Sequence, residues 1–453
     1  MNNQKQTKKP KNENEIRDEY LALQRRLSGS TRRLDVILIA VFLAFIVGFS
    51  AFVFLLPDKE FSEQENRYLQ TFPSASSDFH GNLWERIMAG KFLDRFFAGK
   101  FTEEISDYLS DQFPLRDSFV GLKAGSEIAL LKGENNDVLL GKDGYIIKRS
   151  DFPNADSLQK NIAALKDFSS AERAKGVEVT TALAGRSIDV LESKLPALFD
   201  PTGNRFILGK LESAMGEEPY IDLLLPLKEK ADAGEEVYYR TDHHWTTLGA
   251  YYAYCEIAPA LGIEPFALDS FKRVVASDAF YGTTWSSAGM KWVAPDELHF
   301  FRYEGDELFT VTEMEINKAF IEAQKKAENG EVSDVPLESI PYLSEKANGA
   351  LPSLYDTSYL QKKDKYSAFL GGNKALVRVT WNDTPRETLV IVKDSYAHSL
   401  APFLARHFDL LLVDLRYYTG SVSELIEQED VKKLLFLYNV ANLCDDTSLA
   451  AIN

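Results

Sequence analysis

At 453 residues and 51.0 kDa, the chain exceeds the usual size of one domain, so we expect a large domain with insertions or two domains, plus terminal appendages. Its 45% hydrophobic and 26% charged residues are ordinary globular values, which exclude a disordered, collagen-like or disulfide-stapled chain. The net charge is −17, and because the first 56 residues carry nine Lys/Arg against five Asp/Glu, the remainder carries −21. A phosphate backbone would repel so acidic a body, which argues against nucleic-acid binding.

The N-terminal region predicts a membrane anchor. Residues 1–33 are polar and rich in charge, and we expect a cytoplasmic tail there. Val36–Leu56 then runs for 21 residues without a charge, which as a helix spans the roughly 30 Å of a bilayer's hydrocarbon core. We assign a transmembrane helix to residues 34–56. A buried core helix is the less favoured alternative, and the run is too long for a signal-peptide core and lacks a cleavage pattern after it.

Flanking charges predict the orientation of this span. Nine basic residues precede it: Lys5, Lys8, Lys9, Lys11, Arg17, Arg25, Arg26, Arg32 and Arg33. The chain after it begins with Pro57 and Asp58 and is acidic overall, so the positive-inside rule places the N-terminus in the cytoplasm. We therefore expect a single-pass cell-membrane protein with an extracytoplasmic body. That compartment disfavours ATP or NAD, the sequence has neither GxxxxGKS/T nor GxGxxG, and we expect no cofactor.

The chain after the span divides into two predicted regions. Residues 57–133 form a juxtamembrane region where short helices are expected from the spacing of Trp84, Ile87, Phe92, Phe96, Phe97, Ile105 and Leu109. Residues 134–453 form the main domain. It opens with a strand-like piece at Gly141–Ile147, a helix at Leu158–Lys175 and a strand at Val177–Leu183.

The C-terminal part has the clearest periodicity. Buried strands are predicted at Thr388–Val392, Asp409–Leu415 and Lys433–Val440, and amphipathic helices at Ser395–Phe408 and Ser421–Asp430. Continuously apolar strands alternating with helices indicate an α/β domain whose parallel sheet is flanked by helices. Between about residues 265 and 385 the pattern changes to a charged helix (Glu313–Asn329) and loops rich in Pro and Tyr, which we interpret as an insertion that shapes a site.

The stretch YYRTDHHWTTLGAYYAY (Tyr238–Tyr254) holds the first candidate site. A strand-like segment leads into Asp242, His243 and His244, and a helix is expected from about Thr246, whose hydroxyl suits an N-cap. Asp242 and His244 are two positions apart, so both can point to one side of an extended turn. The carboxylate can then hold one imidazole nitrogen and leave the other as a general base.

Other interpretations of this stretch remain open. Asp242 could cap the turn while the histidines pack in the core. A metal site is the other alternative, but adjacent His243 and His244 cannot easily face one ion, so we predict no metal. The further histidine ligands would have to come from His80, His299, His398 and His407.

The cysteines support neither a zinc site nor a redox motif. Cys255 and Cys444 lie far apart in the sequence, with no CxxC and no Cys/His pattern around them. We expect two buried thiols, and a single disulfide is the alternative.

The second candidate is Ser395, in LVIVKDSYAHS (Leu389–Ser399). It lies where a buried parallel strand meets a helix N-terminus, the place where open α/β sheets present their sites. Free backbone N–H groups there favour an oxyanion and an activated hydroxyl. A serine at such a junction is more often a helix cap. However, a hydroxyl nucleophile needs a base and the base needs an orienting group, and Asp242 and His244 supply both in the same chain.

Two long motifs carry a family resemblance. TDHHWTTLGAYYAY and VKDSYAHSLAPFLARHFDLLLVDLRYY resemble the DHHW protein family of bacterial envelopes, which is similar to the SGNH-fold domains of alginate O-acetylation proteins. The resemblance also covers ENRYLQTFP, LSDQFPLRD, GKDGYI and FYGTTWSSAG, and so most of the chain after the anchor. In the alginate proteins an Asp-x-His signature precedes the Ser turn, the reverse of ordinary SGNH hydrolases, and this sequence has that reversed order.

The resemblance implies an SGNH-hydrolase-like fold with Ser395 as the acyl-accepting nucleophile, His244 as its base and Asp242 as the group that orients the base. The turn reads Lys-Asp-Ser-Tyr instead of Gly-Asp-Ser, so an oxyanion contribution from it rests on backbone N–H groups, such as that of Tyr396. The Gly and Asn that complete an SGNH oxyanion hole have Gly372 and Asn373 as candidates here, with a plain loop turn as the alternative.

The implied function is a membrane-anchored O-acetyltransferase or acetylesterase acting on an envelope or secreted polysaccharide. Acetyl donors are cytoplasmic, so a transferase outside the membrane would need a membrane-bound O-acyltransferase as partner. The alternative is a non-catalytic envelope protein that uses the same fold to bind glycan or to act as a scaffold.

Overall fold

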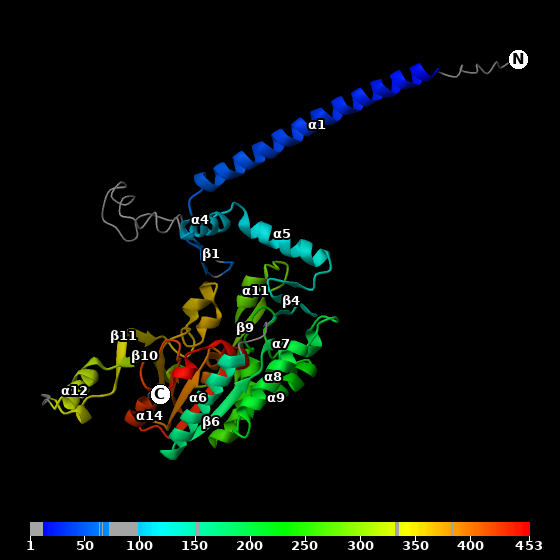
Figure 1. Cartoon of the computed structure of the whole chain (residues 1–453). Helices are drawn as coiled ribbons and strands as arrows, with labels where there is room; N and C mark the ends of the chain where they lie inside the picture. Colours follow the sequence, from blue (N-terminus) through cyan, green and yellow to red (C-terminus); the bar gives the residue numbers. More distant parts are fainter. Residues whose placement is uncertain are drawn as a thin grey trace, which may run out of the picture. The chain divides into compact units, whose positions relative to one another are not determined.

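A computed structural model describes residues 12–62, 64–65, 67–71, 98–149, 155–330, 335–381 and 385–453 (Figure 1). The chain divides into two compact units: Met1–Ser62 with Arg67–Arg116, and Glu63–Asn66 with Asp117–Asn453. Three groups of residues considered above lie outside the described residues. They are the basic positions Lys5–Lys11, the histidine His80, and the positions from Trp84 to Phe97 in the juxtamembrane region.

The first unit contains the long N-terminal helix. Helix α1 (Glu13–Leu55) begins with a capping box in which the Asn12 side chain accepts from backbone N–H groups and the Glu15 side chain accepts from the Asn12 backbone (Figure 1). Within it, Arg32–Phe52 is long and apolar enough to cross a membrane, and none of this stretch is buried in the structure. The unit also contains β1 (Phe61–Ser62), β2 (Arg67–Tyr68) and α4 (Lys100–Asp111).

The second unit is built on an eight-stranded sheet in the order β11-β10-β12-β14-β13-β15-β6-β7. The strands are β6 (Glu178–Ala184), β7 (Ile221–Asp222), β10 (Phe309–Ile316), β11 (Leu343–Leu351), β12 (Leu376–Trp381), β13 (Thr388–Lys393), β14 (Asp409–Val413) and β15 (Lys433–Asn439). The five strands from β14 to β7 pair in parallel, whereas β11, β10 and β12 add an antiparallel side. The sheet is therefore mixed, and the wholly parallel sheet expected from the sequence is corrected to this extent.

Alternating side chains of the parallel strands pack on opposite faces of the sheet. Leu389 and Ile391 of β13 belong to one hydrophobic core, and Val390 and Val392 to the other, and all four are fully buried. The first core includes residues of α7 (Ser187–Val190), α9 (Leu224–Asp232), α10 (Thr247–Ile257) and α13 (Ala397–Leu404). The second includes residues of α6 (Ala155–Ala174), α8 (Thr202–Met215), α12 (Lys318–Glu328), α14 (Val422–Gln428) and α15 (Val440–Asp445). This arrangement explains why the interior of β13, Leu389–Val392, is apolar at every position.

Smaller elements complete the second unit. They are helix α5 (Arg116–Ala129, whose first residue falls in the first unit), a three-stranded sheet of β3 (Glu134–Asn135), β4 (Val138–Leu140) and β5 (Ile146–Lys148), the hairpin of β8 (Lys272–Phe280) and β9 (Asp296–Arg302), and helix α11 (Thr283–Ala288). Cys255 and Cys444 are both free thiols; Cys444 is buried as expected, whereas Cys255 is only partly buried.

The segment expected as an insertion, residues 265–385, contributes three strands to the main sheet as well as the β8–β9 hairpin. Within it, the helix expected at Glu313–Asn329 begins only at Lys318, because Glu313–Ile316 lies in strand β10. Charged side chains alone favoured a helix there. Pairing of β10 with β11 on one side and β12 on the other overrides that local preference.

Candidate active site

Ser395 lies in the short connection between β13 and α13, at the carboxyl end of a central parallel strand. The connection is held by the buried carboxylate of Asp394. That carboxylate accepts hydrogen bonds from the Tyr396 backbone N–H at 2.9 Å, the Asn439 backbone N–H at 2.6 Å and the Asn442 side-chain amide at 2.8 Å. Burial raises the pKa of Asp394 despite these donors. The serine turn is therefore tied to the end of β15.

The loop that carries Asp242 and His244 lies between two segments that pair with each other. An antiparallel bridge joins Tyr238 to Trp245, and Thr246 caps α10 by accepting from the Gly249 backbone N–H at 3.1 Å, as the sequence predicts. The indole N–H of Trp245 donates to the Tyr396 carbonyl at 3.1 Å. Loop and serine turn are thus joined directly, although they are about 150 residues apart.

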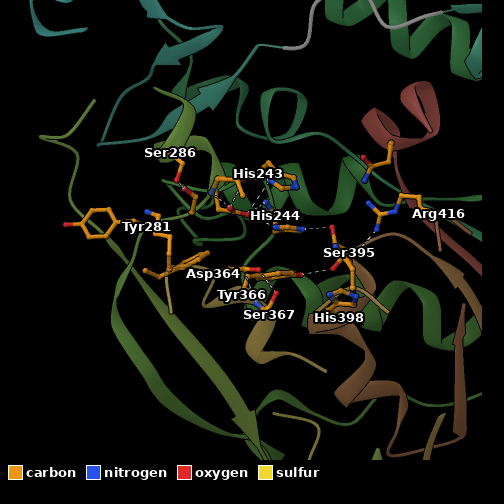
Figure 2. Close-up of a pocket in the computed structure, with 17 residues that line it drawn as sticks. His243, His244, Tyr281, Ser286, Asp364, Tyr366, Ser367, Ser395, His398 and Arg416 are labelled. Atoms are coloured by element: carbon orange, nitrogen blue, oxygen red, sulfur yellow. Dashed lines mark hydrogen bonds and ion pairs between the residues drawn. The ribbon is translucent and has the colours of Figure 1, made fainter. Parts of the chain in front are cut away.

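Asp242, His244 and Ser395 form one chain of hydrogen bonds (Figure 2). The distance from Asp242 Oδ1 to His244 Nδ1 is 2.5 Å, and from His244 Nε2 to Ser395 Oγ it is 2.7 Å. In the resting arrangement His244 Nδ1–H donates to the carboxylate, and the serine hydroxyl donates to Nε2. The three residues that the sequence analysis singled out therefore meet, and the distance from His244 Nε2 to Ser395 Oγ lies within the range of about 2.6–3.2 Å that proton transfer from the hydroxyl requires.

Both oxygens of the Asp242 carboxylate accept further hydrogen bonds. Its Oδ1 also accepts from the His244 backbone N–H at 2.9 Å, and its Oδ2 accepts from the backbone N–H and hydroxyl of Thr283 at 2.7 and 3.0 Å. Burial would raise the pKa of this carboxyl, but the adjacent histidines and these donors outweigh burial and hold the pKa far below its ordinary value. Asp242 therefore stays ionised beside His244.

Tyr366 packs against one face of the His244 ring. The two rings are stacked, with centroids 3.9 Å apart and planes 12° from parallel. The Tyr366 hydroxyl donates to the Ser395 carbonyl at 3.1 Å and contacts the Ser399 hydroxyl at 3.1 Å. One buried tyrosine thus fixes both the base and the serine turn (Figure 2).

Charged groups gather at the carboxyl ends of β13 and β14. The buried Asp414 carboxylate accepts from Arg416 Nε at 2.8 Å and Nη2 at 2.6 Å, and from Lys393 Nζ at 3.1 Å. Lys393 also donates to His398 Nε2 at 2.8 Å. Burial lowers the pKa of both Lys393 and His398, and the Lys393 charge lowers that of His398 further. Asp414 therefore orients Arg416, which lines the same pocket as Ser395.

The pocket around Ser395 has a volume of about 230 Å³. His243, His398, Arg416 and Asn442 line it in addition to the three hydrogen-bonded residues. In Figure 2, Arg416 and Tyr281 lie on opposite sides of Ser395, and both line the pocket.

The three oxyanion candidates from the sequence differ in their availability. The Gly372 backbone N–H donates to the Phe369 carbonyl at 3.2 Å, and the Tyr396 backbone N–H donates to Asp394. The Tyr396 hydroxyl is engaged too, by the His243 carbonyl. Asn373 lines the pocket, and because its Oδ1 accepts from Arg416 Nη2 at 3.4 Å, its Nδ2 N–H groups stay candidate oxyanion donors.

Asp242, His243 and His244 present possible metal-ligand atoms within 4.8 Å of one another. Both ring nitrogens of His244 are already used, one by Asp242 and one by Ser395. A metal ion could bind His244 only by breaking this chain, so the residues do not fit a metal centre.

Comparison with known proteins gives the following relationships. A family model described as the SGNH hydrolase-like domain of acetyltransferase AlgX matches residues 138–284, which contain Asp242 and His244. The chain is 22% identical over 169 residues to a probable alginate O-acetylase AlgJ of Pseudomonas fluorescens, covering 36% of this chain and 43% of that protein. It is 25% identical over 159 residues to AlgJ of Pseudomonas aeruginosa, covering 34% and 40%. The chain thus spans about two fifths of these relatives.

Solved structures with the same fold include a DHHW family protein from Eubacterium siraeum. That structure has a TM-score of 0.53 and 18% identity, and the match covers 70% of this chain and 95% of the other. Bacillus cereus PatB1 has a TM-score of 0.50 and 19% identity, with 69% and 98% covered. The resemblance inferred from the sequence is confirmed. At these identities the structural likeness concerns the fold.

Some residues of the pocket were not predicted from the sequence. Arg416 and Asn442 follow β14 and β15, the two strands that pair with β13, so their positions at the same sheet edge were a usable signal. Gly282 and Thr283 lie in the motif FYGTTWSSAG, which the resemblance includes. Nothing in the local sequence indicates that Tyr366 stacks on His244.

Proposed function

We propose that the chain is a membrane-anchored, extracytoplasmic O-acetyltransferase or acetylesterase that acts on a cell-envelope or secreted polysaccharide. The observation that supports this most is the unbroken hydrogen-bond chain from Asp242 through His244 to Ser395. The similarity to alginate O-acetylases favours acetyl as the acyl group and a polysaccharide as the substrate.

The reaction would proceed in two acyl-transfer steps. His244 Nε2 takes the Ser395 hydroxyl proton while Oγ attacks the acetyl carbonyl carbon, and the bond to the donor oxygen breaks as His244 returns the proton to it. A sugar hydroxyl or water then loses its proton to His244 and attacks the carbonyl carbon of the acetyl-serine, and the bond to Oγ breaks as His244 returns that proton to Oγ. Asp242 stabilises the imidazolium in both steps.

Arg416 and Asn442 are the proposed oxyanion donors. Asn442 uses its side-chain amide toward Asp394, and an amide nitrogen carries a second N–H. Arg416 uses Nε and Nη2 toward Asp414, and a guanidinium has five N–H donors. The proposed oxyanion site therefore leaves out Gly372 and Tyr396, whose backbone N–H groups are engaged inside the protein.

The cellular setting belongs to the same proposal. An apolar helix at Arg32–Phe52 would anchor the chain and leave the pocket outside the cytoplasm. In a transferase, a membrane-bound O-acyltransferase partner would bring the acetyl group across the membrane.

The direct test is acetate release from p-nitrophenyl acetate by the full-length protein in detergent. Ser395→Ala should abolish release, and His244→Ala should lower it comparably, because members of one catalytic unit fail together. Arg416→Met should reduce turnover by roughly 10²–10³ if Arg416 donates to the oxyanion. A chelator should leave the rate unchanged.

Ser286→Ala is the matched control. Ser286 lines the same pocket, but its hydroxyl donates to the Gly282 carbonyl at 3.2 Å and takes no part in the hydrogen-bond chain from Asp242 to Ser395. A sulfonyl fluoride should add its mass to a peptide containing Ser395 in the wild-type protein and in this control. An inert protein with an unlabelled Ser395 would reject the enzyme proposal in favour of a glycan-binding or scaffold protein.

A further inference from the structure

The segment before helix α5 packs against the end of the candidate membrane span. Phe49 and Phe113 have ring centroids 4.5 Å apart, and both belong to the first unit. Phe49 lies in the apolar stretch Arg32–Phe52 and is partly covered, whereas the positions on either side of it are exposed. Gln112 Oε1 accepts from the Lys59 backbone N–H at 2.9 Å, and its Nε2 donates to the Lys59 carbonyl at 3.0 Å. These contacts keep the residues just before α5 beside the last turns of the span.

Helix α5, labelled in Figure 1, begins three residues after Phe113, at Arg116. Because a helix rises 1.5 Å per residue, Leu122 lies about 9 Å further along its axis. The helix and the two residues after it expose large apolar side chains: Leu122 is 65% exposed, Leu130 82% and Leu131 93%. An apolar surface of this kind in a monomer marks a contact with a membrane or another protein.

The opposite face of α5 packs within the second unit. Ala124 is fully buried, and Ile128 packs against the same small core, which also contains Ala288 at the end of α11. The first residue of α11, Thr283, donates to the Asp242 carboxylate. Helix α5 is thus fixed to the body that carries the pocket, and its exposed leucines are not used in that packing.

The surroundings of the exposed leucines suit a lipid surface. Lys123 and Lys132 both pair with Glu127, at 3.4 and 3.2 Å, and both lysine side chains are more than half exposed. Residues 116–132 hold three basic and two acidic residues, a net charge of +1 in an otherwise strongly acidic body. Apolar side chains with lysines at their edge are typical of helices that lie in a membrane interface. Trp292, which is half exposed and lies against α5, is of a residue type enriched at that depth.

We propose that the apolar face of α5, formed by Leu122, Leu130, Leu131 and Trp292, lies in the interface of the bilayer that the span crosses. Its continuity with the span, through the contacts just before α5, assigns this face to lipid. A single span leaves the body free to turn, whereas a second contact with the same bilayer would fix the orientation of the pocket-bearing unit beside the source of an exported acetyl group. This rests on the proposed function, because it takes the apolar stretch of α1 to be a membrane anchor.

Depth-dependent fluorescence quenching in vesicles of phosphatidylcholine and phosphatidylglycerol tests the contact. Full-length Cys255→Ser protein, in which the remaining Cys444 is buried, receives one new cysteine labelled with the fluorophore NBD. The cysteine replaces Leu122 on α5, Leu43 in the span or, as the matched control, Leu198, which is 98% exposed in a turn of the same unit as α5. We expect a nitroxide on the lipid headgroup to quench the probe at 122 and not at 198. A nitroxide on the acyl chain should quench the probe at 43.

A double variant, Leu130→Glu with Leu131→Glu, should remove the quenching at Leu122→Cys, because the binding of an interfacial helix scales with its buried apolar area. Leu225→Glu is the control, since Leu225 is 61% exposed on α9 in the same unit. It should leave the quenching unchanged. Equal urea midpoints of the two variants show that both are folded, and quenching that persists in the double variant would contradict the proposed contact.

The three probe positions separate the possible failures. No quenching at position 43 would reject the membrane anchor of the proposed function, and the contact of α5 with it. Quenching at position 43 with equal signals at 122 and 198 would overturn the contact of α5 and leave the anchor standing. Shielding of position 122 from aqueous iodide without quenching by either lipid would assign the face to a second copy of the chain, which also overturns the proposal.

Discussion

Gly282 lies where any side chain would clash with Asp242. A Cβ atom built there would lie 2.3 Å from both Cβ and Oδ2 of Asp242. Residue 282 must therefore lack a side chain so that the Asp242 carboxylate can keep its position beside His244. The absence of a Cβ atom at this one position thus helps to set the geometry of the hydrogen-bond chain from Asp242 to Ser395.

Gly282→Ala should lower the turnover of p-nitrophenyl acetate about 100-fold, because a displacement of about 1 Å at a catalytic group has that order of effect. Gly209→Ala is the control, since a Cβ at Gly209 in α8 meets no atom within 4 Å. Steady-state kinetics of both variants give the comparison. Wild-type turnover in Gly282→Ala would mean that Asp242 does not orient the base.

Tyr366 is expected to act as a positioning residue through its ring. Tyr366→Phe keeps the face stacked on His244 and loses two hydroxyl contacts, neither of which touches the reacting Ser395 Oγ or His244 Nε2, so turnover should fall less than about tenfold. Tyr366→Leu loses the stacked plane and should lower kcat by about 10–100-fold with little change in KM. A purely structural role predicts instead that both variants lose unfolding free energy while kcat of the folded protein stays unchanged.

At the scale of elements, the sequence predicts best where strands are apolar throughout. The strands expected at Thr388–Val392, Asp409–Leu415 and Lys433–Val440 correspond to β13, β14 and β15 within two residues at each end. Their order in the sheet and the antiparallel strands beside them were not predictable, because residues that pair across a sheet are distant in sequence. For the same reason, the sequence wrongly predicts a helix at Glu313–Ile316, which lies in β10.

The candidate site shows the same difference between features that the local sequence predicts and features that depend on contacts between distant residues. Asp242, His244 and Ser395 were predictable because each stands at a recognisable local feature, a turn before a capped helix or a junction of strand and helix. Tyr366 was not, because its role depends on a ring contact with a residue more than a hundred positions away. The contribution of Arg416 depends on which strands neighbour β13, and this becomes visible only in the sheet.

Helix α10 offers a test of how an element supports the loop. Thr246 accepts from the Gly249 backbone N–H and donates to the Glu236 carbonyl at 2.6 Å. Thr246→Ala should lower the free energy of unfolding by about 1 kcal/mol, the usual cost of a lost N-cap. Thr246→Ser keeps the hydroxyl and should retain most of it. Urea unfolding in detergent measures both, and equal stability of the Ala and Ser variants would show that the cap contributes nothing.

For the whole molecule, a half-buried neutral histidine, His407, predicts a loss of stability in acid. Burial, together with Arg406 and Arg386, lowers the pKa of His407 to about 4, and Tyr254 donates to its Nε2 at 2.7 Å. In the unfolded chain the ordinary pKa is about 6.5. Between these values the unfolded state binds the extra proton, so this contribution is complete above about pH 6.5 and declines as the pH falls toward 4.

His407→Gln keeps an acceptor for Tyr254 but cannot take up a proton. The difference in urea midpoint between about pH 7 and about pH 4.5 should therefore be smaller in His407→Gln than in the wild type. An unchanged difference would assign the acid sensitivity to other groups, among which His398 also has a lowered pKa.

The membrane arrangement is also a property of the whole chain. Helix α1 contains a stretch, Arg32–Phe52, that is apolar enough to span a membrane, and nine basic residues lie before it or at its first two positions, whereas residues 57–453 carry a net charge of −21. Positive residues remain on the cytoplasmic side of a span, whereas acidic domains cross with little cost from their charge. We therefore expect one crossing, with Asn453 outside the cytoplasm.

A fluorescent protein that matures only in the cytoplasm, fused after Asn453, should stay dark, while the same protein fused before Met1 should fluoresce. Alkaline phosphatase, which is active only outside the cytoplasm, should give the opposite pattern at the two ends. Exchanging Arg32 and Arg33 for glutamate in both sets of fusions should reduce this contrast, because the orientation rests on basic residues next to the span. Fluorescence from the Asn453 fusion would place the pocket in the cytoplasm and remove the need for an exported acetyl group.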